Sequence, residues 1–206
     1  MSLFGPVAYI HGMKTAHLDI GFADTDTGSR VGGNPPACFD SDPILDTHDY
    51  LLTLGAATAE WLGDREVSVF VRRGFTIGGD DLDYPDIGVR AVLHGPSARG
   101  AGTRGRHPGL GSAGLVVADP GAETPPFVRI GRAPVLIQNE PTYAARVEAD
   151  GYRFLFQMNE EGWPVTSDPE AEFVEEYLFG YGSVYFYGKF DETGQAGDIV
   201  AGFLDF

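Results

Sequence analysis

One acidic segment holds the densest group of side chains that could bind a metal ion. The run DSDPILDTHD contains Asp40, Asp42, Asp46, His48 and Asp49. Carboxylate oxygens are the ligands that hard divalent cations prefer, so Asp40, Asp42 and Asp46 are candidate metal ligands for hydrolytic chemistry. The spacing lacks the order of an EF-hand calcium loop, and aspartates beside proline also serve as turn and helix-capping residues. Both interpretations stay open, and no other cofactor is indicated.

A second acidic cluster has the composition of a protein-contact surface. The run GGDDLDYPD places Asp80, Asp81, Asp83 and Asp86 around Tyr84, between glycines and beside a proline. Four carboxylates can form charge-assisted hydrogen bonds with arginine or lysine, and a tyrosine can serve as the buried anchor of an interface. The alternative is a solvated turn. We expect these five residues to form a binding surface for a basic partner.

Signatures of known catalytic sites are absent from the sequence. There is no G-x-S-x-G, H-E-x-x-H, Walker or protein-kinase motif. The single cysteine, Cys38, could pair with His48 in space, but no local signature of a thiol–imidazole site surrounds it. The sequence therefore favours a non-catalytic protein and leaves an enzyme open.

An aromatic stretch near the end of the chain could form either a pocket or a buried strand. It reads YLFGYGSVYFYGKF, and EEGWP precedes it with two carboxylates beside an indole. Side chains alternate between the two faces of a strand, so SVYFYG would present apolar or aromatic groups on both faces, as in a strand covered on both sides. We favour the core interpretation. The candidates for a pocket edge are Trp163, Tyr181, Tyr185 and Tyr187.

The charge balance limits the classes of partner. With 30 acidic and 14 basic residues the net charge is −16, which repels the phosphates of nucleic acid and would steer a basic protein toward this one. The alternative is a proteome whose soluble proteins are simply acidic. No signal peptide or apolar run long enough to cross a bilayer is seen, and a lone cysteine fits a reducing compartment. We expect a cytoplasmic protein without membrane or nucleic-acid partners.

Scattered glycines and prolines divide the sequence into short apolar runs, which is typical of many short strands. Proline near a first turn and glycine after a last turn indicate a helix beginning at Pro141 and another at Asp168, whereas Ala56–Leu62 is either a separate helix or the continuation of YLLTL. The predicted strands are Val7–Ile10, Leu18–Phe22, Tyr50–Leu54, Val67–Arg72, Val89–Leu93, Leu115–Ala118, Phe127–Ile130, Tyr152–Met158, Ser183–Tyr187 and Ile199–Phe203.

Residues 95–114 show neither a helix nor a strand pattern. The run GPSARGAGTRGRHPGLGSAG consists largely of Gly, Arg, Ser and Pro, and predicts a mobile surface loop. Its end, GLGSAG, matches the G-x-G-x-x-G fingerprint of dinucleotide sites. That fingerprint needs a strand before the glycines and a helix after them, whereas here a loop precedes and the strand-like LVVA follows. We therefore expect a plain loop.

Two parts of the chain share an order of features. RVGGNP from Arg30 and RIGRAP from Arg129 are each followed by an acid–proline pair, a run that begins with tyrosine, and a related strand, SVFV or SVYF. Four markers in the same order indicate an internal duplication. We assign the first repeat to about residues 30–74 and the second to about 129–190, packed around a pseudo-twofold axis.

The second repeat resembles a known family. RIGRAPVLIQNEP, FLFQMNEEG and LFGYGSVYFYG are similar to the YwqG-like bacterial family of unknown function, over about Phe127 to Phe190 and more weakly over Arg30 to Val71. The sequence departs from that pattern at Arg132, where the family has a glycine, and at Gly55, where it has a glutamine. The resemblance implies a fold and carries no agreed chemistry.

Together these observations predict one α+β domain over residues 1–206, mainly of antiparallel strands, built from two intertwined repeats with a few short helices. The function that we expect is a non-catalytic acidic protein that sequesters or neutralises a basic protein partner, in the manner of an immunity protein. The alternative is a small-molecule-binding protein or metal-dependent hydrolase with its site at the repeat interface.

Overall fold

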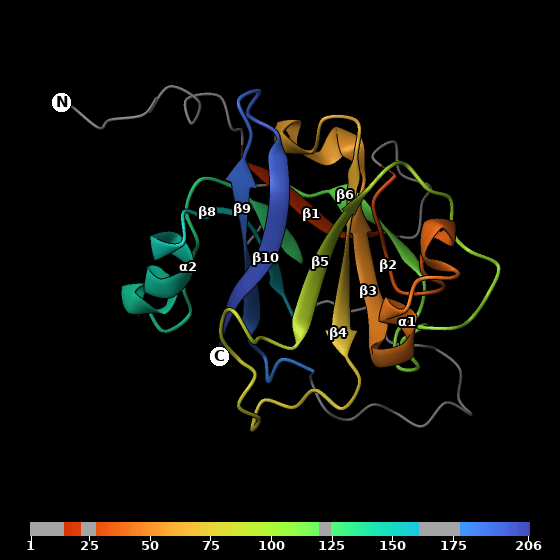
Figure 1. Cartoon of the computed structure of the whole chain (residues 1–206), viewed down its shortest axis with the longest axis horizontal. Helices are drawn as coiled ribbons and strands as arrows, with labels where there is room; N and C mark the ends of the chain where they lie inside the picture. The colour runs from red at the N-terminus through yellow and green to blue at the C-terminus, as the bar shows by residue number, and fades with distance from the viewer. Residues whose placement is uncertain (1–14, 22–27, 120–124, 161–177) are drawn as a thin grey trace.

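The described residues of the chain form a ten-stranded antiparallel sheet that curls into a nearly closed barrel, as Figure 1 shows. The structure is a computed structural model that describes residues 15–21, 28–119, 125–160 and 178–206. The strand order is β10-β9-β8-β7-β1-β6-β2-β3-β4-β5, so β5 and β10 are the two ends of the sheet. This architecture confirms the prediction of mainly antiparallel strands with few short helices.

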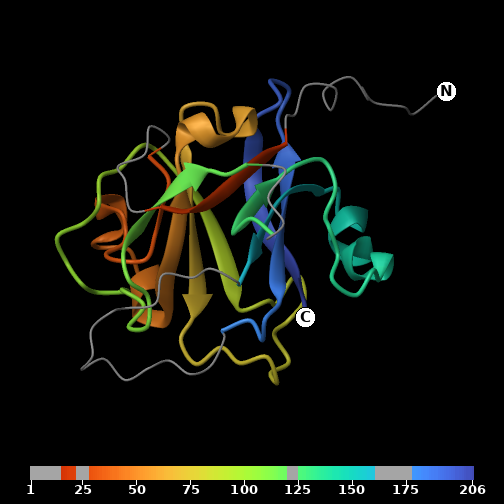
Figure 2. The same cartoon turned by 180° about the vertical axis from the view of Figure 1, so that it is seen from behind.

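Two strands in the middle of the sheet join its two sides, and Figure 2 shows them from behind. These are β1 (Ala16–Gly21) and β6 (Ala113–Val117). On one side follow β2 (Arg30–Val31), β3 (His48–Leu54), β4 (Glu66–Arg72) and β5 (Val89–His94). On the other side follow β7 (Val128–Ile130), β8 (Arg153–Asn159), β9 (Ser183–Phe190) and β10 (Ala196–Asp205).

The helices are single turns or little more. They are η2 (Ala37–Phe39), α1 (Ile44–Thr47), η3 (Ala56–Thr58), η4 (Glu60–Leu62), η5 (Pro141–Ala144) and α2 (Ala145–Ala149). The predicted helix at Pro141 is confirmed, because η5 and α2 follow each other there. Among the described residues, no helix is long and apolar enough to span a bilayer.

The alternating pattern of β9 places its side chains on two buried faces, as the sequence predicts. Val184 and Phe186 point into the barrel and belong to its main core, whereas Tyr185 and Tyr187 belong to a second cluster outside it. All four side chains are fully buried. The aromatic stretch is therefore core over this strand.

Two smaller apolar clusters cover the outside of the barrel. Beside β3 and β4, the cluster consists of Phe39, Leu45, Tyr50 and Phe70, under η2 and α1. Beside β8, β9 and β10, the cluster consists of Ala144, Val147, Tyr152, Phe154, Tyr185, Tyr187 and Phe203, under η5 and α2. The four helices η2, α1, η5 and α2 thus cover apolar outer faces of strand pairs, whereas η4 places Trp61 and Leu62 in the main core.

Several elements differ from the sequence-based expectation. The strand at Tyr50–Leu54 is confirmed, but the residues after it form two separate 3₁₀ turns, η3 and η4, and not one helix. Strand β2 was not expected, because two residues are too few to show a pattern. The predicted strand Val7–Ile10 and the predicted helix from Asp168 lie outside the described residues.

Residues 95–114 run as an irregular chain from β5 to β6, which begins at Ala113. This segment lies against the first side of the sheet, where the amides of Ala37 and Tyr50 donate to the carbonyls of Ala98 and Gly105. Strand β6, and not a helix, follows the glycines of GLGSAG, as the sequence LVVA predicts. Gly32, at φ +60°, passes so close that a side chain there would meet the Gly111 carbonyl.

Candidate functional site

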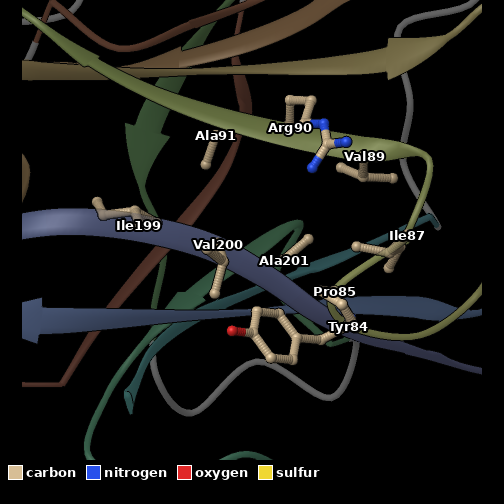
Figure 3. A pocket seen from close by; sticks show the side chains of 9 residues that line it. All are labelled: Tyr84, Pro85, Ile87, Val89, Arg90, Ala91, Ile199, Val200 and Ala201. Carbon is tan, nitrogen blue, oxygen red and sulfur yellow. The ribbon is translucent and has the colours of Figure 1, made fainter. Parts of the chain in front are cut away.

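The barrel is not closed by hydrogen bonds between β5 and β10, which are the two edge strands of the sheet (Figure 3). We call the space between these two strands the β5–β10 gap. Within the described chain, no backbone hydrogen bond joins β5 to β10. The gap is closed at one end by the loop before β5. There the Tyr84 amide donates to the Gly202 carbonyl at 2.6 Å, and the Leu204 amide donates to the Leu82 carbonyl at 3.0 Å.

A small, shallow hollow of about 50 Å³ lies in this gap. Ile199 and Ala201 from β10 and Ala91 from β5 belong to or pack against the main core, so they form an apolar floor. The complete lining is Tyr84, Pro85, Ile87, Val89, Arg90, Ala91, Ile199, Val200 and Ala201. The hollow therefore combines an apolar floor with a polar rim formed by Tyr84 and Arg90.

Tyr84 is held in place at the rim by contacts from distant parts of the chain. Its ring centroid lies 5.8 Å from that of Tyr152, and its hydroxyl donates to the Asp150 carboxylate at 2.8 Å. That hydrogen bond is the main reason why the pKa of Tyr84 is raised above its ordinary value. The aromatic residue of the predicted contact loop is therefore fixed in orientation before any partner binds.

The neighbouring ring, Tyr152, likewise donates its hydroxyl to a carboxylate. Its hydroxyl donates to the Asp198 carboxylate at 2.5 Å, and the Lys189 ammonium lies 4.3 Å from its ring centroid. The hydrogen bond to Asp198 is the largest cause of the raised pKa of Tyr152. Each of the two aspartates keeps free lone pairs after accepting one phenol proton, so each can accept a further donor.

The five residues predicted as a partner surface divide into two groups. Asp80, Asp83 and Asp86 are exposed, and Tyr84 is half-buried at the rim. Asp81 is only 8% exposed, and its carboxylate pairs with the Arg72 guanidinium at 2.7 Å. Asp81 thus anchors the loop to the end of β4. Only the other three aspartates present their carboxylates to solvent.

Arg90 stands on the β5 side of the gap, where Figure 3 shows its guanidinium beside the hollow. It is exposed, and no described residue forms a hydrogen bond or ion pair with it. The two sides of the gap therefore differ in charge, because β5 contributes a cation whereas β10 contributes Asp198.

Two of the three predicted metal ligands are engaged with protein groups. Asp42 accepts a hydrogen bond from the Ile44 amide at 2.8 Å, as a turn aspartate does, and Asp46 pairs with Arg104. Asp40 is exposed. Over the ranges that the structure describes, no three His, Cys, Asp or Glu side chains lie close enough together to hold a metal ion.

Of the aromatic pocket candidates, Tyr185 and Tyr187 lie together in the outer cluster and do not line the hollow. Tyr185 donates its hydroxyl to the Val135 carbonyl at 2.9 Å, and the hydroxyl of Tyr187 is buried without a hydrogen-bond partner in the outer cluster. Tyr181 is 63% exposed with φ of +63°, and its amide donates to the buried Glu160 carboxylate at 2.6 Å. Trp163 lies outside the described residues.

A buried polar chain crosses the first side of the sheet, which the sequence did not indicate. The Ser68 hydroxyl lies 2.8 Å from His94 Nε2 and 2.8 Å from the Thr53 hydroxyl. His94 Nδ1 lies 2.7 Å from the Gly95 carbonyl and 3.8 Å from Glu66. This order resembles a nucleophile–base–acid series, but Ser68 has no exposed surface, so a substrate cannot reach it and the chain ties β3, β4 and β5 together.

The structure adds four residues to the rim that sequence reasoning missed, namely Arg90, Asp150, Tyr152 and Asp198. Tyr152 was visible as the first residue of a repeat marker. The other three could not be recognised in the sequence, because no local pattern surrounds them. They come together only in the folded barrel, where β8 and β10 lie beside the loop before β5.

No family model, no curated protein and no solved structure matches this chain.

Proposed function

We propose that the protein is a non-catalytic binding protein whose acidic, aromatic rim around Tyr84 captures a basic protein. The observation that supports it is the half-exposed ring of Tyr84, which lies between Asp83 and Asp86 in the chain, both exposed, and is fixed by the hydrogen bond of its hydroxyl to Asp150 and by its contact with the buried ring of Tyr152. Aromatic faces attract arginine and lysine, and carboxylates accept charge-assisted hydrogen bonds from them. A rim that offers both groups together is suited to cationic side chains.

The overall charge supports the same proposal at longer range. A net charge of −16 attracts a cationic protein over about 8–10 Å at physiological ionic strength, which raises the association rate. Affinity requires in addition an anchor that is buried in the complex. Tyr84 is suited to that role, because its backbone and hydroxyl are already fixed by Gly202 and Asp150. Neutralising a toxic basic protein, as immunity proteins do, is a function of this class.

The fold supports an internal duplication, which we also propose. In the registers of the sheet, Arg30 faces Thr53 on β3, and Arg129 faces Gln157 on β8. The registers of the following pairs, β3–β4 and β8–β9, then slip at equivalent places, where Leu51 and Leu155 stand. A duplicated unit of five strands would give this agreement.

The central strands support the same duplication. Ala16 on β1 faces Ile130 on β7, and Ala113 on β6 faces Val31 on β2. The strand that precedes each repeat in the chain therefore pairs with the first strand of the other repeat. The β5–β10 gap would then lie where the last strands of the two repeats meet. A site at the repeat interface was one of our sequence-based alternatives, and the resemblance to the YwqG-like family, whose motifs lie in the second repeat, stays a proposal beside it.

A pull-down from the native lysate at low and high salt tests the proposed function. We expect a basic protein to be retained at low salt and released at high salt, because surface charges are screened. The double variant Asp83→Asn/Asp86→Asn should retain less of it. The matched control is Asp64→Asn/Glu192→Gln, which removes the same charge from two exposed acids in the turns after η4 and before β10, whereas the loop with Asp83 and Asp86 lies at the other end of β10. Equal retention by both variants would contradict the proposal.

A second candidate function is supported by the unpaired Arg90 beside the hollow. A guanidinium above an apolar floor suits a small molecule with one carboxylate and an apolar body. A thermal-shift screen of such acids distinguishes the two functions. An acid that raises the melting temperature of the wild type, but not of Arg90→Gln, would favour the small-molecule site.

A further inference from the structure

We infer that the basic partner docks apolar side chains of its own on the end of the barrel where β10 ends, the lower end in Figure 1. We call this surface the end face and define it by the exposed side chains of Ile77, Ile137, Tyr143, Tyr181 and Phe206. The inference rests on the proposed function. It goes further because it adds an apolar anchor surface to Tyr84 and predicts apolar as well as cationic side chains on the partner.

Exposed apolar side chains concentrate on the end face. Of the eight large apolar side chains that are exposed in the described part of the chain, five belong to it. Ile137 and Tyr181 are the most open of these five, at 51% and 63% exposed. Single apolar side chains scattered over a surface are ordinary, whereas a contiguous group of them marks an interaction site.

On one side of the end face, two apolar side chains flank the turn that presents Tyr181. A side chain built on Gly180 would come within 2.9 Å of the Ile77 Cδ1 atom, so Ile77 packs directly against that glycine. A side chain on Gly182 would come within 2.8 Å of the Phe206 Cβ atom. Ile77 and Phe206 therefore lie on either side of Tyr181, although they are distant from it in the chain.

On the other side, the side chain of Gln138 connects the remaining members. Its amide group donates to the Phe206 carbonyl, and its carbonyl oxygen accepts from the Tyr143 hydroxyl at 2.9 Å. Ile137 is the preceding residue, so it lies between Phe206 and Tyr143 on the same surface. The five side chains thus form one contiguous patch.

Two buried carboxylates hold this patch in a fixed shape. Glu160 is 2% exposed and accepts from the amides of Phe179 and Tyr181 at 2.5 and 2.6 Å. Asp205 is 1% exposed and accepts from the Ile137 amide at 2.6 Å. Tyr181 also has a φ of +63°, which is uncommon for a residue other than glycine. Buried charge and backbone strain both cost stability, and a surface that is fixed in advance loses less entropy on binding.

The charges beside the end face specify the kind of partner. Asp83 forms a β-bridge with Phe203, and the Phe203 ring lies 5.5 Å from the Tyr143 ring, so the exposed Asp83 borders the patch. Asp80 is exposed in the same loop as Ile77. An apolar centre with a charged border is the usual anatomy of a protein–protein interface. A partner that matches this border carries lysine or arginine around its own apolar side chains.

The same charges disfavour a second copy of this chain as the occupant. Two arginines near this end, Arg72 and Arg73, are already paired with Asp81 and Asp49. A second copy would bring its own net charge of −16 and the same exposed aspartates to the contact, and like charges repel. Charge complementarity therefore selects a basic protein.

The experiment compares three synthetic peptides on the wild-type protein. The first is a capped amphipathic helix with leucines along one face and lysines along the other. The second has alanine in place of each leucine and so keeps the charge, and the third has glutamate in place of each lysine and so keeps the apolar face. Binding is measured by fluorescence anisotropy at low and at high salt.

Two matched variants locate the contact. Ile137→Ser/Tyr181→Asn removes two exposed apolar side chains of the end face and keeps their backbone amides, and asparagine tolerates the positive φ at position 181. Val117→Ser/Phe190→Ser removes two exposed apolar side chains on β6 and at the far end of β9. Urea unfolding checks that both variants are folded, and the peptide comparison on the wild type does not depend on either variant.

We expect the leucine–lysine peptide to bind at least about tenfold more tightly than the alanine–lysine peptide, and this ratio should persist at high salt because apolar burial is not screened. The end-face variant should lose the ratio, whereas the control variant should keep it. The leucine–glutamate peptide should not bind.

Equal affinity of the two lysine peptides for the wild type, or equal effects of the two variants, would overturn the apolar anchor while leaving the acidic rim as a binding surface. Failure of both lysine peptides to bind at low salt would count against both proposals. Equal binding of the leucine–glutamate peptide would show that the partner is not selected by charge. A dimer of the wild type that the end-face variant abolishes would show that a second copy is the occupant, and would also overturn the inference.

Discussion

The rings of Tyr84 and Tyr152 lie 5.8 Å apart at the edge of the β5–β10 gap, one from the loop before β5 and one from the residue before β8. Each phenol donates its proton to a carboxylate of its own, Asp150 or Asp198. The pair thus joins both sides of the barrel at the place where the sheet does not close. Several consequences of this arrangement can be measured.

The side chain of Tyr84 is expected to act as the anchor of the complex. Tyr84→Ala removes the ring and should reduce the affinity for the basic partner by more than about tenfold, roughly 1.4 kcal/mol. The free energy of unfolding should fall much less, because the variant loses only an exposed hydrogen bond and the contact with the Tyr152 ring, while the backbone bond to Gly202 stays. Titration calorimetry and urea unfolding measure the two quantities. Phe190→Ala is the control, since Phe190 is also partly exposed but lies at the far end of β9; an equal loss of affinity in both variants would refute the role of Tyr84.

Arg90 is expected to slow the approach of a basic partner. Arg90→Glu replaces the cation of the β5 side with an anion, so the association rate should rise by about two- to fivefold at low salt and the rise should vanish at high salt. Stopped-flow fluorescence with the recovered partner measures this. A lower association rate in this variant would mean that Arg90 contacts an acidic group of the ligand, as the small-molecule alternative requires.

The buried carboxylate of Asp205 is expected to be essential for stability. It is 1% exposed, and it accepts from the Ile137 amide at 2.6 Å and from the Gln138 amide at 3.3 Å. Asp205→Ala leaves these two amides without their acceptor, which should lower the free energy of unfolding by about 1–3 kcal/mol. Chemical unfolding measures the difference against Asp64→Ala, an exposed control. A loss of less than about 0.5 kcal/mol would contradict the hydrogen-bonding described for the loop at Ile137.

Three histidines are expected to make the fold less stable in mild acid. Burial lowers the pKa of His48, His94 and His107 below their ordinary value of 6.5. In the window below 6.5, the unfolded chain binds protons before the folded chain does, so their contribution to stability is full above pH 6.5 and is lost as the pH falls through and below that value. NMR titration of the imidazole rings should place all three midpoints below 6.5. Midpoints at or above 6.5 would contradict the burial of these rings.

The strand pattern of this chain could be predicted because it depends on local chemistry. The alternation in SVYFYG places Val184 and Tyr185 on opposite faces of β9, and turn residues delimit the other strands. Two-residue β2 could not be predicted, because it is defined only by its pairing with β3 and β6. Tertiary packing likewise decides that YLLTL forms a strand and that the residues after it form two 3₁₀ turns.

The candidate site could be predicted only at its loop. Composition identified Tyr84 and the aspartates around it, but it could not show that Asp81 turns inward to pair with Arg72. Asp150 and Asp198 become rim residues only when the barrel curls and brings β10 beside the loop before β5. Such contacts connect residues that are distant in the chain, and the local patterns of a single sequence do not predict them.

The central claim is that exposed carboxylates of the rim receive a basic partner. The most direct measurement is the association rate of the recovered partner with Asp83→Asn/Asp86→Asn and with the charge-matched control Asp64→Asn/Glu192→Gln, at low and at high salt. We predict that the rim variant associates about three- to tenfold more slowly than the control at low salt, and that the two converge at high salt. Equal association rates of the two variants at low salt would contradict the claim.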